Sequence, residues 1–157
     1  MAVLNIVKRK DNEEFLRKKS REVTEITPRI TTLIDDMIET MRHANGVGLA
    51  AVQVGVLRRI VVIETEDDGL FELINPVIIA KCGEQETPEG CLSLPKEWGI
   101  TRRPNAVTVR ALNRYGEQIE ITGKGLLAKA ICHELDHLDG ILFTDKIIRR
   151  LGEDEIE

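Results

Sequence analysis

LLAKAICHELDHLDG, residues 126–140, combines an apolar stripe at helical spacing with an H-E-x-x-H cluster. The spacing of the apolar positions predicts a helix from Leu126 to Asp139. On such a helix His133 and His137 lie one turn apart, so both imidazoles point the same way. The pair indicates a divalent metal site, and Glu134 would be close enough to take a proton from a water molecule there.

Glu134 occupies the middle of the apolar stripe, where a carboxylate is unexpected. Burying such a group without a partner costs on the order of several kcal/mol, because water no longer solvates its charge. A solvated helix face that merely carries histidines would not explain this position. The stripe therefore favours a buried metal site over a pair of surface histidines.

The histidines alone do not complete a catalytic metal site, because such sites usually have three protein ligands. One metalloprotease pattern, H-E-x-x-H-x-x-G-x-x-H, supplies a third histidine, but that position holds Phe143 here. A glutamate further along the chain is another solution, yet the short acidic segment up to Glu157 leaves no room for a supporting helix. Cys91, within the sequence E-G-C-L-S, would be a strong third ligand as a thiolate.

The cysteines leave a second kind of metal site open. Their odd number, three, favours reduced thiols over disulfides. A structural zinc-binding module without catalysis would close its site with four ligands, namely Cys82, Cys91, His133 and His137. That alternative gives Glu134 no role. A metallopeptidase acting on internal peptide bonds is a further alternative, which the third-ligand argument disfavours.

The composition indicates one soluble domain over residues 1–157. Its 22 basic and 27 acidic residues give a net charge of −5 and are scattered, which argues against binding to nucleic acids or membrane surfaces. No apolar run is long enough to span a bilayer, and the start of the chain lacks the pattern of an export signal. We therefore expect a cytoplasmic protein whose acidic end, residues 152–157, is frayed.

Outside the central motif, the sequence predicts one further helix and several strands. The helix is capped by Thr27, begins with Pro28 and ends near Gly46. Runs rich in valine and isoleucine predict strands at residues 59–64, 72–80, 106–112 and 118–122. A turn at 113–116 would join the last two strands, and the aperiodic stretch 81–104, with three prolines, is predicted to be a loop.

Three motifs in order along the chain resemble those of the peptide deformylase family. Residues 46–53 read GVGLAAVQ and are similar to the family's G-x-G-L-A-A-x-Q. Residues 89–93 read EGCLS, and residues 133–137 match the family's H-E-x-D-H. The Arg103-Pro104 pair ahead of a strand is also similar, and the likeness extends over nearly the whole chain.

The resemblance implies an α+β fold in a single catalytic domain. Mostly antiparallel sheets would wrap around a central metal-binding helix, with an N-terminal amphipathic helix beside them. It also implies that Cys91, His133 and His137 bind one divalent metal. Family likeness favours Fe2+ in the cell, and Zn2+, Ni2+ or Co2+ would suit the same ligands.

The activity implied by the resemblance is removal of the N-formyl group from newly made polypeptides that begin with formylmethionine. Glu134 would be the general acid and base, and the Gln53 side chain and the backbone N–H of Leu92 would stabilise the oxyanion. The substrate-binding positions that match the family are Val47, Gly48, Gly90, Leu126 and Ala130. Core packing would explain the larger apolar residues among them equally well.

The implied partners are nascent formylated polypeptides, with no nucleic acid and no membrane. Transient ribosome association stays open, because the chain stops soon after Leu151, whereas some relatives continue into a longer helix that helps docking. Cys132 stands where many family members have glutamine and places a thiol beside a ligand histidine. Asp136, inside the motif, is expected to orient a histidine or to pair with Arg103.

Overall fold

A computed structural model describes residues 2–152 of the chain. The helices are α1 (Arg9–Leu16), α2 (Pro28–His43) and α3 (Leu126–Leu138), with 3-10 turns η1 (Ala51–Val54) and η2 (Phe143–Asp145). The strands are β1 (Gly48–Ala50), β2 (Ile60–Thr65), β3 (Gly69–Cys82), β4 (Gln85–Cys91), β5 (Leu94–Arg103), β6 (Ala106–Leu112), β7 (Gln118–Lys124) and β8 (Ile147–Leu151).

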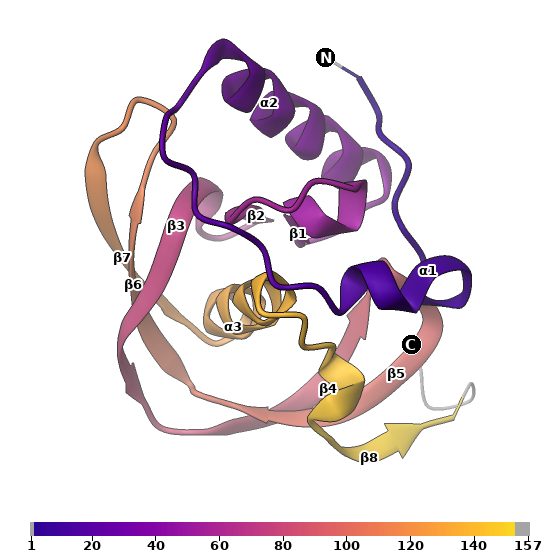
Figure 1. Cartoon of the computed structure of the whole chain (residues 1–157). Helices are drawn as coiled ribbons and strands as arrows, with labels where there is room; N and C mark the ends of the chain where they lie inside the picture. Colours follow the sequence, from indigo (N-terminus) through magenta and orange to yellow (C-terminus); the bar gives the residue numbers. More distant parts are fainter. Residues whose placement is uncertain (1, 153–157) are drawn as a thin grey trace.

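Within this part of the chain the strands form two antiparallel sheets that surround α3. One sheet has the order β1-β2-β3-β6-β7 and the other the order β4-β5-β8. Figure 1 shows α3 near the centre, with α2, β1 and β2 on one side of it and β4, β5 and β8 on the other. The predicted α+β fold around a central helix is confirmed.

The helix α2 begins where the sequence predicts, because Thr27 and Pro28 suit the first positions of a helix. The Thr27 hydroxyl accepts a hydrogen bond from the backbone N–H of Ile30 at 3.4 Å, and Pro28 lacks the N–H that a first turn leaves unpaired. The buried face of α2 includes Met37 and Met41 and packs against β1 and β2. These methionines are therefore core side chains.

The helix α3 is buried on most of its surface, which explains its apolar sequence. Leu127, Ile131 and Leu138 are almost fully buried and share one core with Val61 and with other residues of the larger sheet. Leu126 departs from the predicted apolar stripe, since its side chain is 50% exposed. The first turn of the helix opens onto a cleft, and Leu126 lies in the wall of that cleft.

The prediction of a loop over residues 81–104 is wrong, since most of this stretch forms the β4–β5 hairpin. Pro88 lies in β4, an edge strand, which is where sheets tolerate proline. Pro95 lies in the part of β5 that precedes its pairing with β8. A register shift between Glu89 and Cys91 further hides the strand periodicity.

The other predicted strands correspond to β2, β3, β6 and β7, and the predicted turn joins β6 to β7 through Gly116 at φ +79°. The elements α1, β1 and β8 were not predicted. α1 is irregular at Asn12 and β1 has three residues, so periodicity gives little signal there.

No helix within residues 2–152 is long and apolar enough to cross a membrane. Residues 153–157 of the tail that was expected to fray lie outside the described residues.

Candidate active site

α3 and β4 bring together three side chains that could hold a metal ion. The ligand atoms of Cys91, His133 and His137 all lie within 4.8 Å of one another. Nε2 of His137 lies 3.2 Å from Nε2 of His133 and 3.3 Å from Sγ of Cys91. Both histidines are buried, whereas the cysteine is partly exposed. The expected ligand atoms therefore converge on one point.

The two distances from Nε2 of His137 are close to those expected around a single cation. In a tetrahedral site with nitrogen ligands at about 2.0–2.1 Å and a sulfur ligand at about 2.3 Å, the ligand atoms lie roughly 3.3–3.7 Å apart. The nearby Oε1 of Glu134 is buried and has no hydrogen-bond partner among residues 2–152. A thiolate and two imidazoles suit a transition metal better than Mg2+ or Ca2+. The donor atoms thus fit one transition-metal ion.

Glu89 orients His133, a role that was not predicted. Oε2 of Glu89 lies 2.5 Å from Nδ1 of His133. When Nδ1 carries the proton, it donates a hydrogen bond to this carboxylate, and the lone pair of Nε2 is free to bind a metal. The available signal was the place of Glu89 in the EGCLS motif, two residues before Cys91.

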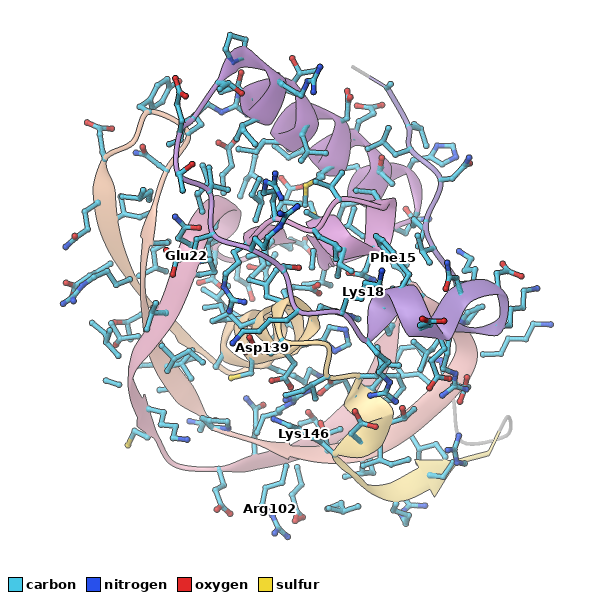
Figure 2. All side chains as sticks on the ribbon, in the orientation of Figure 1. Phe15, Lys18, Glu22, Arg102, Asp139 and Lys146 are labelled. Atoms are coloured by element: carbon cyan, nitrogen blue, oxygen red, sulfur yellow. The ribbon has the colours of Figure 1, made fainter. Side chains whose placement is uncertain are left out.

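Arg103 neutralises Glu89 and ties it to α3. Nη2 and Nε of Arg103 donate to the two oxygens of Glu89 at 2.7 and 3.0 Å, and Nη1 donates to Asp136 at 2.7 Å. Burial alone would raise the pKa of Glu89, but the hydrogen bonds from His133 and Arg103 hold it well below its usual range. The expected pair of Arg103 with Asp136 is therefore present. The neighbouring Arg102 is exposed and points away from α3 (Figure 2).

Glu134 is held against the backbone of β1. Its side chain is buried, and a Cβ atom added at Gly48 would lie 2.6 Å from its Oε2. Glycine is therefore the residue that leaves room for the carboxylate. Burial raises the pKa of Glu134 to about 7, which allows it to gain and lose a proton near neutral pH.

Gln53 is buried, and both ends of its amide are hydrogen-bonded. Its Oε1 accepts from the backbone N–H of Ala50 at 2.9 Å, and its Nε2 donates to Oγ of Ser93 at 3.1 Å. The same Nε2 lies 3.6 Å from Sγ of Cys91, so the amide faces the metal-binding group. The hydrogen bond from Gln53 to Ser93 was not predicted. The only indication in the sequence was that Ser93 belongs to the EGCLS motif. Leu92 lies between Cys91 and Ser93 and lines the cleft.

A cleft of about 550 Å³ leads to these residues. Cys91, His133 and Glu134 form part of its wall. A Cβ atom added at Gly90 would lie 2.9 Å from the Trp98 ring, so the wall also requires glycine at that position. The structure brings all the expected substrate-binding residues to this cleft: Val47, Gly48, Gly90, Leu126 and Ala130.

The other cysteines lie outside the metal-binding group. Cys82 is exposed at the end of β3 and is not a member of the ligand cluster found within residues 2–152. The alternative of a structural zinc site with four ligands is therefore wrong. Cys132 is buried, and burial raises the pKa of its thiol, which lowers its reactivity.

Sequence comparisons with known proteins agree on one family. The family model described as polypeptide deformylase matches residues 3–152. The peptide deformylase of Acetivibrio thermocellus is 62% identical over 149 residues, which cover 95% of this chain and 87% of that protein. The peptide deformylase of Alkaliphilus metalliredigens is 59% identical over 141 residues, which cover 90% of this chain and 95% of that protein.

Solved structures extend the similarity to the fold. A peptide deformylase from Legionella pneumophila has a TM-score of 0.88 and 41% identity, and the match covers 98% of this chain and 89% of that chain. The peptide deformylase from Thermotoga maritima also has a TM-score of 0.88, with 36% identity over 94% of this chain and 99% of that chain. The match includes both sheets and the central helix, since it covers nearly every residue.

Proposed function

Since this chain belongs to the polypeptide deformylase family and is thus a hydrolase that removes the N-formyl group from newly made polypeptides, we propose that Glu134 moves the proton in this reaction. The observation that carries the proposal is the buried carboxylate of Glu134, whose Oε1 has no partner among residues 2–152. A carboxylate with a pKa of about 7 can accept a proton from the attacking water and return it to the leaving nitrogen.

Cys91, His133 and His137 would hold the metal ion of this reaction. We propose Fe2+ in the cell, and the same ligands accept Zn2+, Ni2+ or Co2+. Such an ion supplies Lewis acidity, which makes water a better nucleophile at neutral pH and polarises the formyl carbonyl. Glu89 keeps the His133 ring in place through Nδ1, so that Nε2 faces the other ligand atoms.

Gln53 and the backbone N–H of Leu92 would stabilise the formyl oxygen as it becomes negatively charged. Support comes from Nε2 of Gln53, which faces Cys91, and from the position of Leu92 directly after that ligand. Hydrogen bonds to Ala50 and Ser93 keep the Gln53 amide from rotating, so it needs no rearrangement during the reaction. Loss of one such donor typically raises the barrier by about 3 kcal/mol.

Discrimination in favour of formyl over larger acyl groups would follow from the tight space around Glu134. Gly48 and Gly90 lie where a single added carbon atom already collides with a neighbouring side chain. Little room is therefore left for an acetyl methyl group beside the reacting carbon. The apolar surface available to the methionine side chain comes from Val47, Leu126 and Ala130.

The substrate also suggests where the enzyme acts. We propose that the enzyme acts in the cytoplasm, where newly made chains still carry the formyl group. We also propose that it associates transiently with the ribosome that synthesises these chains. The three cysteines are free thiols, which suits a reducing compartment.

Formate release from formyl-Met-Ala-Ser tests the activity. Protein loaded with Fe2+ under anaerobic conditions should deformylate this peptide and leave acetyl-Met-Ala-Ser intact, as measured by a formate assay and by mass spectrometry of both peptides. Metal analysis of protein prepared without air tests the identity of the ion. Absence of formate with each of the four metals would contradict the proposed function.

A further inference from the structure

Three lysines lie in the wall of the deformylation cleft and come from different parts of the fold. Lys8 directly precedes α1, Lys96 lies in β5, and Lys129 lies in α3. Lys96 is exposed, and the other two are partly exposed. These three residues form what we call the lysine rim. None of them is among the residues to which the reaction assigns a role.

Among residues 2–152, no carboxylate forms a salt bridge with a lysine of the rim. Nζ of Lys8 donates to the backbone oxygen of Leu92 at 3.4 Å, and Nζ of Lys129 donates to that of Pro88 at 2.8 Å. Both acceptors are uncharged, and an ammonium group has three N–H bonds to offer. Burial lowers the pKa of Lys129, and the charge of Glu89 offsets part of this effect. The positive charges therefore remain available to a ligand.

The acidic side chains around the same cleft are already paired or buried. Glu97 contacts Arg9 and Arg150, and Glu89 is bound by Arg103. The catalytic carboxylate is buried at the reacting centre. The mouth of the cleft is therefore positively charged, although the chain as a whole carries a net charge of −5.

We infer that the cleft prefers formylated chains with acidic side chains directly after formylmethionine over chains with basic side chains there. The inference rests on the deformylase activity of this cleft and adds a class of substrate to it. A polypeptide whose first residue is bound at the reacting centre must leave the cleft past its walls, where Lys8, Lys96 and Lys129 lie. Carboxylates in the next few residues would meet unpaired ammonium groups, whereas lysine or arginine would be repelled.

The expected preference is moderate and depends on salt. An exposed pair of opposite charges changes an equilibrium by about two- to fivefold, so two charged substrate residues should change kcat/KM by about tenfold between acidic and basic peptides. Screening shortens the range of these interactions from about 10 Å at 0.1 M salt to about 3 Å at 1 M. The preference should therefore shrink to about twofold or less at 1 M salt.

Three amidated peptides test the inference: formyl-Met-Glu-Glu-Ala, formyl-Met-Ala-Ala-Ala and formyl-Met-Lys-Lys-Ala. The amide removes the terminal carboxylate, which would otherwise add a negative charge to every peptide. The value of kcat/KM for the metal-loaded enzyme should fall in the order acidic, neutral, basic at low salt. We expect the change to be mainly in KM, since the lysine rim does not touch the reacting atoms.

Variants locate the source of the preference. Lys8→Gln, Lys96→Gln and Lys129→Gln should each lower the acidic-to-basic ratio of kcat/KM by about two- to threefold, and Lys96→Glu should lower it further. Lys124→Gln, at an exposed position in β7 that does not line the cleft, is the matched control and should keep the ratio. Melting temperatures verify that each variant is folded.

The outcomes separate this inference from the deformylase activity itself. If no formylated peptide releases formate, the activity fails. If the neutral peptide reacts but the acidic and basic peptides react equally or in the reverse order, the preference is wrong and the activity stands. A preference that persists in all three single variants and in the triple glutamine variant would overturn the assignment to the lysine rim.

Discussion

Two buried carboxylates near His133 show how the chemistry is set at the scale of single residues. Arg103 and His133 bind Glu89, so its pKa is low and the group stays ionised. Burial raises the pKa of Glu134 to about 7, and its Oε1 has no partner among residues 2–152. Two carboxylates whose pKa values are pushed apart can divide the work, one holding a ligand and the other moving a proton.

Replacing Glu134 by Gln should leave metal binding intact and lower kcat by about two to four orders of magnitude, because only proton transfer is removed. Elemental analysis and formate release measure the two effects separately. Glu120→Gln, at an exposed position in β7, is the matched control and should keep kcat. A Glu134→Gln variant with near-normal turnover would refute the acid–base role.

The Gly48→Ala variant should lower kcat/KM by about 100-fold while the protein stays folded. The added methyl group would lie 2.6 Å from Oε2 of Glu134 and would push the carboxylate out of position. Gly46→Ala is the control, because its methyl group would meet the movable end of the Leu92 side chain and should cost less activity. Steady-state kinetics with formyl-Met-Ala-Ser measures both variants, and equal losses would contradict this explanation.

At the scale of elements, the β4–β5 hairpin and α3 supply complementary parts of the site. β4 carries Glu89 and Cys91, and α3 carries the histidines and Glu134. The hydrogen bonds of Arg103, which ends β5, connect this hairpin to α3 through Asp136. The hairpin was not predicted because its prolines and its register shift remove the alternation by which a strand is recognised.

The start of α2 offers a test of an element that does not enter the chemistry. Thr27→Ala removes the cap of α2 and should lower the free energy of unfolding by about 1 kcal/mol, which corresponds to a melting temperature lower by about 2–4 °C. Thr31→Ala is the control, because its hydroxyl only donates to the carbonyl of Pro28 in the exposed first turn. Differential scanning calorimetry compares the variants, and equal melting temperatures would mean that the cap contributes little.

At the scale of the whole molecule, a bound metal would join parts of the chain that are far apart in sequence. Cys91 belongs to the smaller sheet. The histidines belong to α3, which packs against the larger sheet. An ion held by both connects the two sheets through their shared helix. A ligand that binds only the folded state also stabilises that state.

Removal of the metal should therefore lower the melting temperature. At a free metal concentration of about 1,000 times its dissociation constant, the stabilisation lost is about 4 kcal/mol. Calorimetry of metal-loaded and chelator-treated protein measures the difference, and added metal should restore the higher value. The melting temperature of a His137→Ala variant should respond much less to the chelator. Identical melting of the loaded and stripped wild-type protein would show that the ion does not connect these elements.

The sequence by itself determined the parts of the site that depend on local geometry. Helical spacing brings His133 and His137 to one side of α3, and the apolar neighbours of Glu134 predict its burial. Both statements follow from the repeat of one helix and need no knowledge of the rest of the fold. The motifs that resemble the deformylases then indicated Cys91 and Gln53.

Only the tertiary structure decided which distant residues meet. Glu89 and His133 are 44 residues apart and Gln53 and Ser93 are 40 apart, so no local periodicity relates them. The exclusion of Cys82, the hairpin in place of a loop and the gathering of the lysine rim at one cleft have the same origin. Sheet pairing and core packing place these residues, because they depend on contacts between elements and not on the spacing within one.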